Sequence, residues 1–128
     1  MNKIQYESIA KAIVHSCYNV HREMGPGLLE SIYELCLIEE LKQKKLNIKN
    51  QVSIPLLYKN TVLSKDFKID ILVENEIIIE LKAVETILPV HKAQLISYLK
   101  LADKRMGFLI NFNVALIKDG IQRIVNNY

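Results

Sequence analysis

The 128-residue chain contains no tryptophan, only four glycines and three prolines, and two cysteines. This scarcity of glycine and proline excludes a collagen-like chain and a long flexible or proline-rich linker. Cys17 and Cys36 are too few for a disulfide framework or for a site of four thiolates. We therefore expect both to be reduced residues of the core, and the protein to be cytoplasmic.

Long apolar runs and a strong excess of one charge are missing as well. No apolar stretch approaches the roughly 20 residues that cross a bilayer, and the polar start MNKIQYESIAKAIVHSC does not resemble a secretory signal. Lys and Arg exceed Asp and Glu by 17 to 14, which permits a nucleic-acid partner without arguing for one. Half the residues are hydrophobic, so we expect one globular domain over residues 1–128 and no membrane partner.

The first third of the chain has apolar residues at helical spacing: Ile9, Ile13, Cys17 and Val20. They predict a helix over residues 4–23. Gly25-Pro26-Gly27 should end it, because proline lacks an amide donor and glycine frees the backbone. A second helix is expected over residues 28–45.

Beyond residue 50 the apolar period changes to two, which predicts strands. The expected strands span residues 52–58, with Pro55 at an edge or bulge, 66–73, 76–83 and 106–112. A turn at Lys59-Asn60 separates the first two strands, and a helix from Pro89 to about residue 103 precedes the last. A short helix or strand from Gly120 closes the chain. The sequence thus predicts a mixed α/β fold of order α-α-β-β-β-α-β, antiparallel at first and with one helical crossover.

The polar loop Glu74-Asn75-Glu76 predicts a three-residue hairpin connection. Opposed residue numbers in such a hairpin sum to 150, which puts Asp70 across from Glu80 with Cβ atoms about 4.5–5.5 Å apart. The other face of the first strand should be apolar throughout: Phe67, Ile69, Ile71 and Val73.

Two carboxylates about 5 Å apart repel by roughly 3 kcal/mol at an effective dielectric of 20. A hard divalent cation such as Mg²⁺ would turn this repulsion into a binding site. The alternative interpretation is a solvated sheet face whose charges have no function.

Glu30 is an acid among apolar positions of the second predicted helix. On a helical wheel it falls between Leu37 and Leu41, where an unpaired charge would be costly. Alternatively, Glu30 is a first-turn acid that the helix dipole favours.

The helix after Pro89 carries His91, Gln94 and Tyr98 at spacings of three and four residues. Imidazole, amide and phenol groups on one face offer hydrogen bonds to a phosphate or a base edge. The alternative is an ordinary solvated helix face.

These residues together resemble a known constellation. Asp70 followed by Glu80-Leu81-Lys82 is similar to the D…(D/E)xK signature of the PD-(D/E)XK nuclease superfamily, and Gln94 with Tyr98 matches the QxxxY element of its RecB-like branch. The segment GLLESIY, residues 27–33, fits the pattern of the GxxExxY protein family, which the strings IIIELKAVE and LINF also resemble. The resemblance covers residues 5–125. It implies a restriction-endonuclease-like αβββαβ core, with a central mixed sheet flanked by helices.

The resemblance also implies a set of metal ligands. Asp70, Glu80 and the main-chain carbonyl of Leu81 match these ligands, and Glu30 matches a helical glutamate that contacts the metal directly or through water. Lys82 matches the lysine that helps to activate the attacking water or stabilises developing negative charge. One position departs from the older motif, because Ile69 stands where that motif has proline.

Substrate contacts are implied for a second group of residues. Gln94 and Tyr98 match the pair that orients the substrate. His91 is a further candidate on its spacing alone, since the motif covers only the other two.

The implied activity is Mg²⁺-dependent hydrolysis of phosphodiester bonds in nucleic acid, with DNA expected rather than RNA and Mn²⁺ as a possible substitute ion. Two cysteines exclude the iron–sulfur cluster that some RecB-like enzymes carry on four cysteines. A homodimer or a larger partner would extend the small binding surface. The alternatives are a non-catalytic module that binds nucleic acid or protein, and a toxin-like or defence component acting on RNA. The intact set of Glu30, Asp70, Glu80 and Lys82 argues against loss of catalysis.

Overall fold

The computed structural model describes the backbone of residues 1–128 and the side chains of residues 1–63 and 67–128. Its helices are α1 (Lys3–Met24), α2 (Glu30–Gln43), α3 (Pro89–Leu101) and a short 3₁₀ helix, η1 (Ile117–Gly120). Its strands are β1 (Ile48–Tyr58), β2 (Thr61–Val73), β3 (Ile77–Lys82), β4 (Met106–Asn111) and β5 (Ile121–Val125). The predicted order of elements is confirmed, and both a short helix and a strand close the chain.

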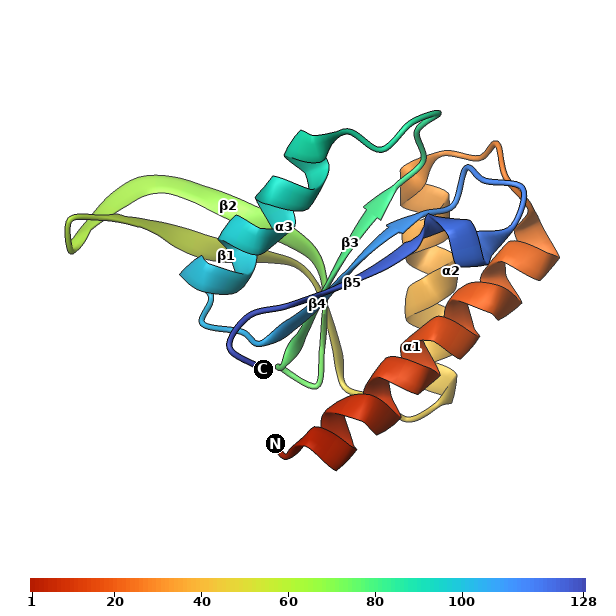
Figure 1. Ribbon diagram of the computed structural model, residues 1–128, viewed down its shortest axis with the longest axis horizontal. Helices are drawn as coiled ribbons and strands as arrows, with labels where there is room; N and C mark the ends of the chain where they lie inside the picture. The colour runs from red at the N-terminus through yellow and green to blue at the C-terminus, as the bar shows by residue number, and fades with distance from the viewer.

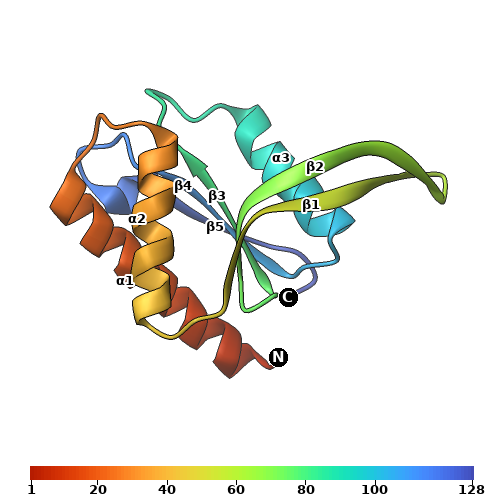
Figure 2. The same ribbon diagram turned by 180° about the vertical axis from the view of Figure 1, so that it is seen from behind.

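The strands form one five-stranded mixed sheet in the order β1-β2-β3-β4-β5. The first three strands run antiparallel, α3 makes the crossover to a parallel β4, and β5 is antiparallel to β4. Figures 1 and 2 show α1 and α2 on one face of the sheet and α3 on the other. The predicted mixed α/β fold, with helices flanking the sheet, is therefore confirmed.

Apolar side chains fill a separate core on each face of the sheet. One core, between the sheet and α1 and α2, includes the fully buried Ile13, Leu37 and Ile79. The other lies beneath α3 and includes Ile78 and Leu95. Burying one such side chain is worth about 1.5–3 kcal/mol, so packing holds helices on both faces. Neither sheet face is solvated throughout, which contradicts that part of the alternative interpretation; whether the charges have a function stays a prediction.

The two cysteines are free thiols. Cys17 is fully buried in the core beneath α1, whereas Cys36 is half-buried and packs against the edge of that core. The expectation of two core residues thus holds fully only for Cys17. No helix in the described part of the chain combines the length and apolarity that a bilayer span needs.

The hairpin between β2 and β3 has the predicted register. Val73 pairs with Ile77 and Ile71 with Ile79, and Glu74 and Asn75 adopt left-handed conformations with φ of 53° and 57°. The three-residue loop is confirmed by these pairs. The ladder ends at Ile71 and Ile79, so the next residues of the two strands are not paired through their backbones.

The side chains of the β1–β2 hairpin change faces at Gln51 and Asp70, which corrects the prediction of one apolar face on β2. Ile71 packs on the α1 and α2 side, whereas Ile69 packs beneath α3, although they are two residues apart. The side chains of β1 change faces at the same level, since Ile48 packs on the α1 and α2 side and Val52 packs beneath α3. A single apolar face over residues 67–73 is therefore wrong.

The backbone of Gln51 supplies a physical reason for this change of faces. Gln51 has φ of 51° within β1, and a left-handed residue breaks the alternation of side chains between the two faces of a strand. Beyond it the hairpin curves away from the sheet and packs along α3, as Figure 1 shows. Pro55 lies on this edge strand beside a register shift, as predicted.

Glycine and alanine at position 51 should therefore differ in their effect on stability. A non-glycine residue with left-handed backbone angles costs about 1 kcal/mol or more. We expect the free energy of unfolding of Gln51→Gly to exceed that of Gln51→Ala by about 1 kcal/mol, because both lose the side chain and only glycine relieves the backbone. Chemical denaturation of the two variants measures the difference. An alanine variant more stable than the glycine variant would contradict the left-handed conformation.

Candidate active site

Asp70 and Glu80 lie where β2 separates from β3. The Asp70 amide donates a hydrogen bond to Glu80 Oε1 at 3.2 Å, and the Leu81 amide donates to Asp70 Oδ2 at 2.8 Å. Each carboxylate thus takes the place of a backbone carbonyl of the opposite strand. The predicted juxtaposition of the two acids is found, with their side chains filling the fork between the strands.

Glu80 is the more deeply buried of the pair, with 5% of its surface exposed. Burial and then the neighbouring negative charge of Asp70 raise the pKa of Glu80 to about 9. The amide of Asp70 and the charge of Lys82 act in the opposite direction but do not offset these effects. Burial in the metal-free protein therefore favours the protonated form of the Glu80 carboxyl.

Lys82 ends β3 and is half-buried. It lies opposite Asn111 of β4, a buried polar residue whose amide donates to the Val84 carbonyl at 2.9 Å and accepts from the Val84 amide at 3.1 Å. These two bonds fix the chain just after the lysine. The string LINF, which ends β4, thus has a structural part in shaping the site.

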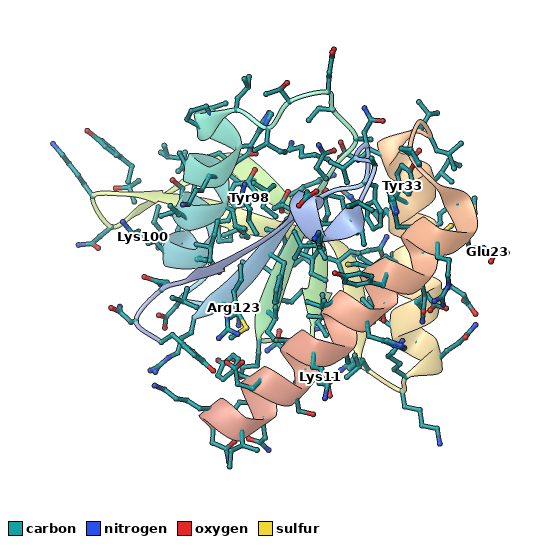
Figure 3. All side chains as sticks on the ribbon, turned by 45° about the vertical axis from the view of Figure 1, so that its right-hand side comes forward. Lys11, Glu23, Tyr33, Tyr98, Lys100 and Arg123 are labelled. Atoms are coloured by element: carbon teal, nitrogen blue, oxygen red, sulfur yellow. The ribbon has the colours of Figure 1, made fainter. Side chains whose placement is uncertain are left out.

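Tyr98 reaches the acid pair from α3. Its side chain is buried, and burial, followed by the charges of Glu80 and Asp70, raises its pKa. Gln94 Nε2 donates to the Tyr98 hydroxyl at 3.0 Å. Figure 3 shows Tyr98 on the helix that covers this side of the sheet. The predicted pair therefore interacts, with Tyr98 facing the acids and Gln94 at the surface.

His91 has a different role from its two neighbours. Its Nδ1 accepts a hydrogen bond from the Leu88 amide at 3.0 Å, which closes the first turn of α3. The structure gives no contact between His91 and the acid pair. Its substrate role stays a prediction, and the capping bond accounts for its position.

Glu30 is the first residue of α2 and is exposed. Partial burial and the charge of Asp70 raise its pKa, whereas Lys82 lowers it, so Glu30 lies on the side of the molecule that carries the site. It continues the line of the buried Tyr33, Leu37 and Leu41, as the helical wheel predicted, but it lies in the first turn of α2, as the alternative interpretation had it, and is not buried with them. Because side chains on a helix lean toward its N-terminus, a residue in the first position projects beyond the core.

Tyr33 has a structural role that accounts for its place in the GxxExxY pattern, three residues after Glu30. It is fully buried, its hydroxyl donates to the Gly25 carbonyl at 2.5 Å, and it accepts from the Leu28 amide at 3.1 Å. Its ring stacks on Phe112 with centroids 4.6 Å apart, and Figure 3 shows it on α2 near the loop. Gly27 has φ of 98° within this loop, which favours glycine. Tyr33 thus holds the loop from which α2 and Glu30 start.

Two polar residues near the site were not predicted. Gln51 Nε2 lies 2.9 Å from Glu34 Oε1 and 3.4 Å from Asp70 Oδ1, and burial together with the charge of Asp70 raises the pKa of Glu34. The spacing of four residues from Glu30 places Glu34 on the same helix face, and this signal was present in the sequence. No sequence signal marks Gln51, whose position depends on its left-handed backbone.

The donor set of the fork fits a hard divalent cation. Two carboxyl groups from adjacent strands converge, and burial and the charge of Asp70 raise the pKa of Glu80 in spite of Lys82. Among the side chains that the structure describes, no group of three His, Cys, Asp or Glu residues could hold a metal ion. The metal-ligand role of Asp70 and Glu80 stays a prediction, and Mg²⁺ at a site with two carboxylates takes its remaining oxygens from water, main chain and phosphate. The role of Glu30 as a direct or water-mediated ligand stays a prediction.

A groove of about 530 Å³ lies between α1 and β5, apart from the acid pair. Its lining includes Lys11, Tyr18 and Phe108, and none of the predicted site residues. The candidate site is therefore located by the contacts between Asp70 and β3, and not by the size of a groove.

Replacing Glu80 by glutamine should remove a pH-dependent loss of stability. Folding raises the Glu80 pKa from 4.5 to about 9, so its stabilising contribution is complete below about pH 4.5 and is lost as the pH rises toward 9. In EDTA we expect the Tm of the parent protein to fall between pH 5 and 9 more steeply than that of Glu80→Gln, whose amide stays neutral. Thermal unfolding across this range measures the effect, with the exposed Glu39→Gln as matched control. Parallel curves for the parent and Glu80→Gln would contradict the raised pKa.

Comparison with known proteins identifies the family. The model of the PD-(D/E)XK nuclease superfamily matches residues 7–124, a span that contains the acid pair, Lys82 and all of α3. No curated protein matches the chain significantly, and no solved structure does. The match covers most of the chain and agrees with the mixed sheet and the acids at its fork. The chain belongs to the PD-(D/E)XK nuclease superfamily.

Proposed function

We propose that this protein is a divalent-metal-dependent nuclease that hydrolyses phosphodiester bonds, with DNA as its expected substrate. The observation that carries the proposal is the reciprocal bonding of Asp70 and Glu80 across the fork between β2 and β3. A buried acid pair without a cation is unfavourable for folding, so its presence beside a lysine favours a function. Membership of a nuclease superfamily supports the same reaction class.

Asp70 and Glu80 would hold the ion, together with the main-chain carbonyl of Leu81. When bound, Mg²⁺ or Mn²⁺ supplies Lewis acidity toward the phosphate and toward an attacking water. Lys82 places an ammonium group beside the acids, where it stabilises negative charge that develops on the phosphate. Its position at the end of β3, held by the contact of Asn111 with Val84, keeps this charge in place.

Residues from both helical layers complete the proposed machinery. Tyr98 and Gln94 orient the substrate from α3, and their mutual hydrogen bond fixes the phenol relative to the amide. Glu30 adds negative charge from the start of α2, near enough to Asp70 and Lys82 to respond to both. We keep His91 as a weaker candidate for a substrate contact, because its imidazole closes the first turn of α3.

Within the superfamily, we propose that the chain belongs with the GxxExxY proteins and with the RecB-like branch. The loop contacts of Tyr33 and the bond between Gln94 and Tyr98 give both motifs a physical basis. We further propose one domain over residues 1–128, acting in the cytoplasm without an iron–sulfur cluster. The two free thiols support these last points.

Lys82→Met provides the clearest test of catalysis. One preorganised charged donor is typically worth about 10²–10³ in rate, so we expect this variant to lose most cleavage and to keep Mg²⁺ and nucleic-acid binding with a small change in Tm. Labelled single- and double-stranded DNA and RNA, incubated with Mg²⁺, Mn²⁺ or EDTA, report cleavage and its metal dependence. Lys11→Met, an exposed lysine of α1, is the matched control.

Two outcomes would contradict the nuclease proposal. In the first, the parent protein binds nucleic acid but cleaves none of the four substrates with either ion, which would identify a binding module. In the second, Lys82→Met loses binding in step with loss of folding, which would make Lys82 a structural counter-ion. Preferential cleavage of RNA would correct the expected substrate and leave the reaction class intact.

A further inference from the structure

The outer part of the β1–β2 hairpin, residues 52–69, forms an arm that projects from the molecule. Strand β2 pairs with β3 only at Ile71–Val73, and β1 pairs only with β2, so the arm has two strands. Figures 1 and 2 show it extending past α3, with its tip away from the other elements. A two-stranded ribbon alone is marginally stable in water, and here only its base packs beneath α3.

The tip of this arm exposes large apolar side chains on both of its faces. Leu57 and Val62 are paired across the strands and are 51% and 66% exposed. Tyr58 is 61% exposed, and Lys59 Nζ lies 5.5 Å from its ring centroid. Four such residues close together on a projecting tip, Leu57 and Tyr58 on β1 and Val62 and Leu63 on β2, indicate a contact surface rather than a solvated turn.

The charge of the arm points to the kind of partner. Residues 52–69 contain three lysines and one aspartate by sequence, so they carry two of the three net positive charges of the chain. The two lysines whose side chains the structure describes, Lys59 and Lys68, are exposed. Lysines beside an exposed aromatic ring suit a partner with phosphates and stacked bases. An apolar protein partner would not need this charge.

The arm is also continuous with the proposed active site. Lys68 precedes Asp70 by two residues on β2, and Phe67 packs against Tyr98 with ring centroids 5.6 Å apart. A nucleic-acid strand whose phosphate lies at Asp70 and Glu80 has the arm beside it. Two-stranded ribbons of this width enter the grooves of nucleic acids.

We propose that the β1–β2 arm is a nucleic-acid clamp: Tyr58 with Leu57 and Val62 contacts bases or sugars, and Lys59 contacts a phosphate away from the cleavage point. This inference rests on the proposed nuclease function. It adds a second contact, on the part of the chain that lies outside the acid fork.

Binding measurements on arm variants test this proposal. The full chain carrying Lys82→Met in Mg²⁺ is titrated into labelled single- and double-stranded DNA and RNA, with Tyr58→Ala or Lys59→Ala added. We expect Tyr58→Ala to weaken binding by about tenfold or more, as the loss of a stacked aromatic does. Lys59→Ala should lower the slope of log affinity against log salt by about 0.9 on duplex DNA. The matched controls are Tyr18→Ala and Lys11→Ala, exposed residues of α1 that should leave binding unchanged.

The possible results separate the arm from the nuclease function. If Tyr58→Ala and Lys59→Ala bind nucleic acid as tightly as the Lys82→Met chain and the two controls do, the arm proposal is overturned while the proposed nuclease function stands. If the Lys82→Met chain binds no nucleic acid at all, both proposals fall. Sedimentation of the same variants gives the remaining result. If arm substitutions abolish self-association and leave nucleic-acid binding unchanged, the tip is an interface between copies and the clamp is wrong.

Discussion

The separation of β2 from β3 at Asp70 and Glu80 is the constraint on which the site depends. Where the ladder ends, two buried amides would lack acceptors, and leaving them unpaired would cost free energy. The two carboxylates supply those acceptors, one from each strand. The same side chains that complete the sheet are those proposed to hold a cation, and the folded chain brings them together by itself.

This arrangement places two acidic side chains close together in a partly buried site, where their negative charges repel each other. Burial and the charge of Asp70 favour the protonated form of Glu80. Burial and nearby negative charge also raise the pKa of Glu34 on α2 and of Tyr98 on α3. Lys82 is the positive charge that opposes the rise at Glu80. Groups with strongly shifted pKa values cluster at functional sites because the arrangements that shift them serve chemistry rather than stability. A divalent ion in the fork would neutralise the repulsion between the two acids that Lys82 alone does not offset.

Local rules explain which parts of this could be predicted from the sequence. The register of the β2–β3 hairpin followed from the three polar loop residues, and with it the juxtaposition of the Asp70 and Glu80 side chains. The change of faces in β1 and β2 could not be predicted, because Gln51 is left-handed without being glycine or asparagine. The helical wheel placed Glu30 on the face of Tyr33, Leu37 and Leu41 but could not show that it lies beyond the core, because a wheel ignores where the helix begins. The substrate role predicted for His91 left out its bond to the start of α3.

Whether Asp70 and Glu80 hold a divalent ion can be measured by calorimetric titration of Mg²⁺ or Mn²⁺ into the protein, in two buffers of different ionisation enthalpy near pH 7.5. A cation that enters the fork must displace the proton of Glu80, since metal ligands bind deprotonated. We expect an ion to bind with release of about one proton, and Glu80→Gln to lose that release. Binding that Glu80→Gln leaves unchanged would show that the acid pair does not hold the ion, whereas binding with no proton released would contradict the raised pKa of Glu80.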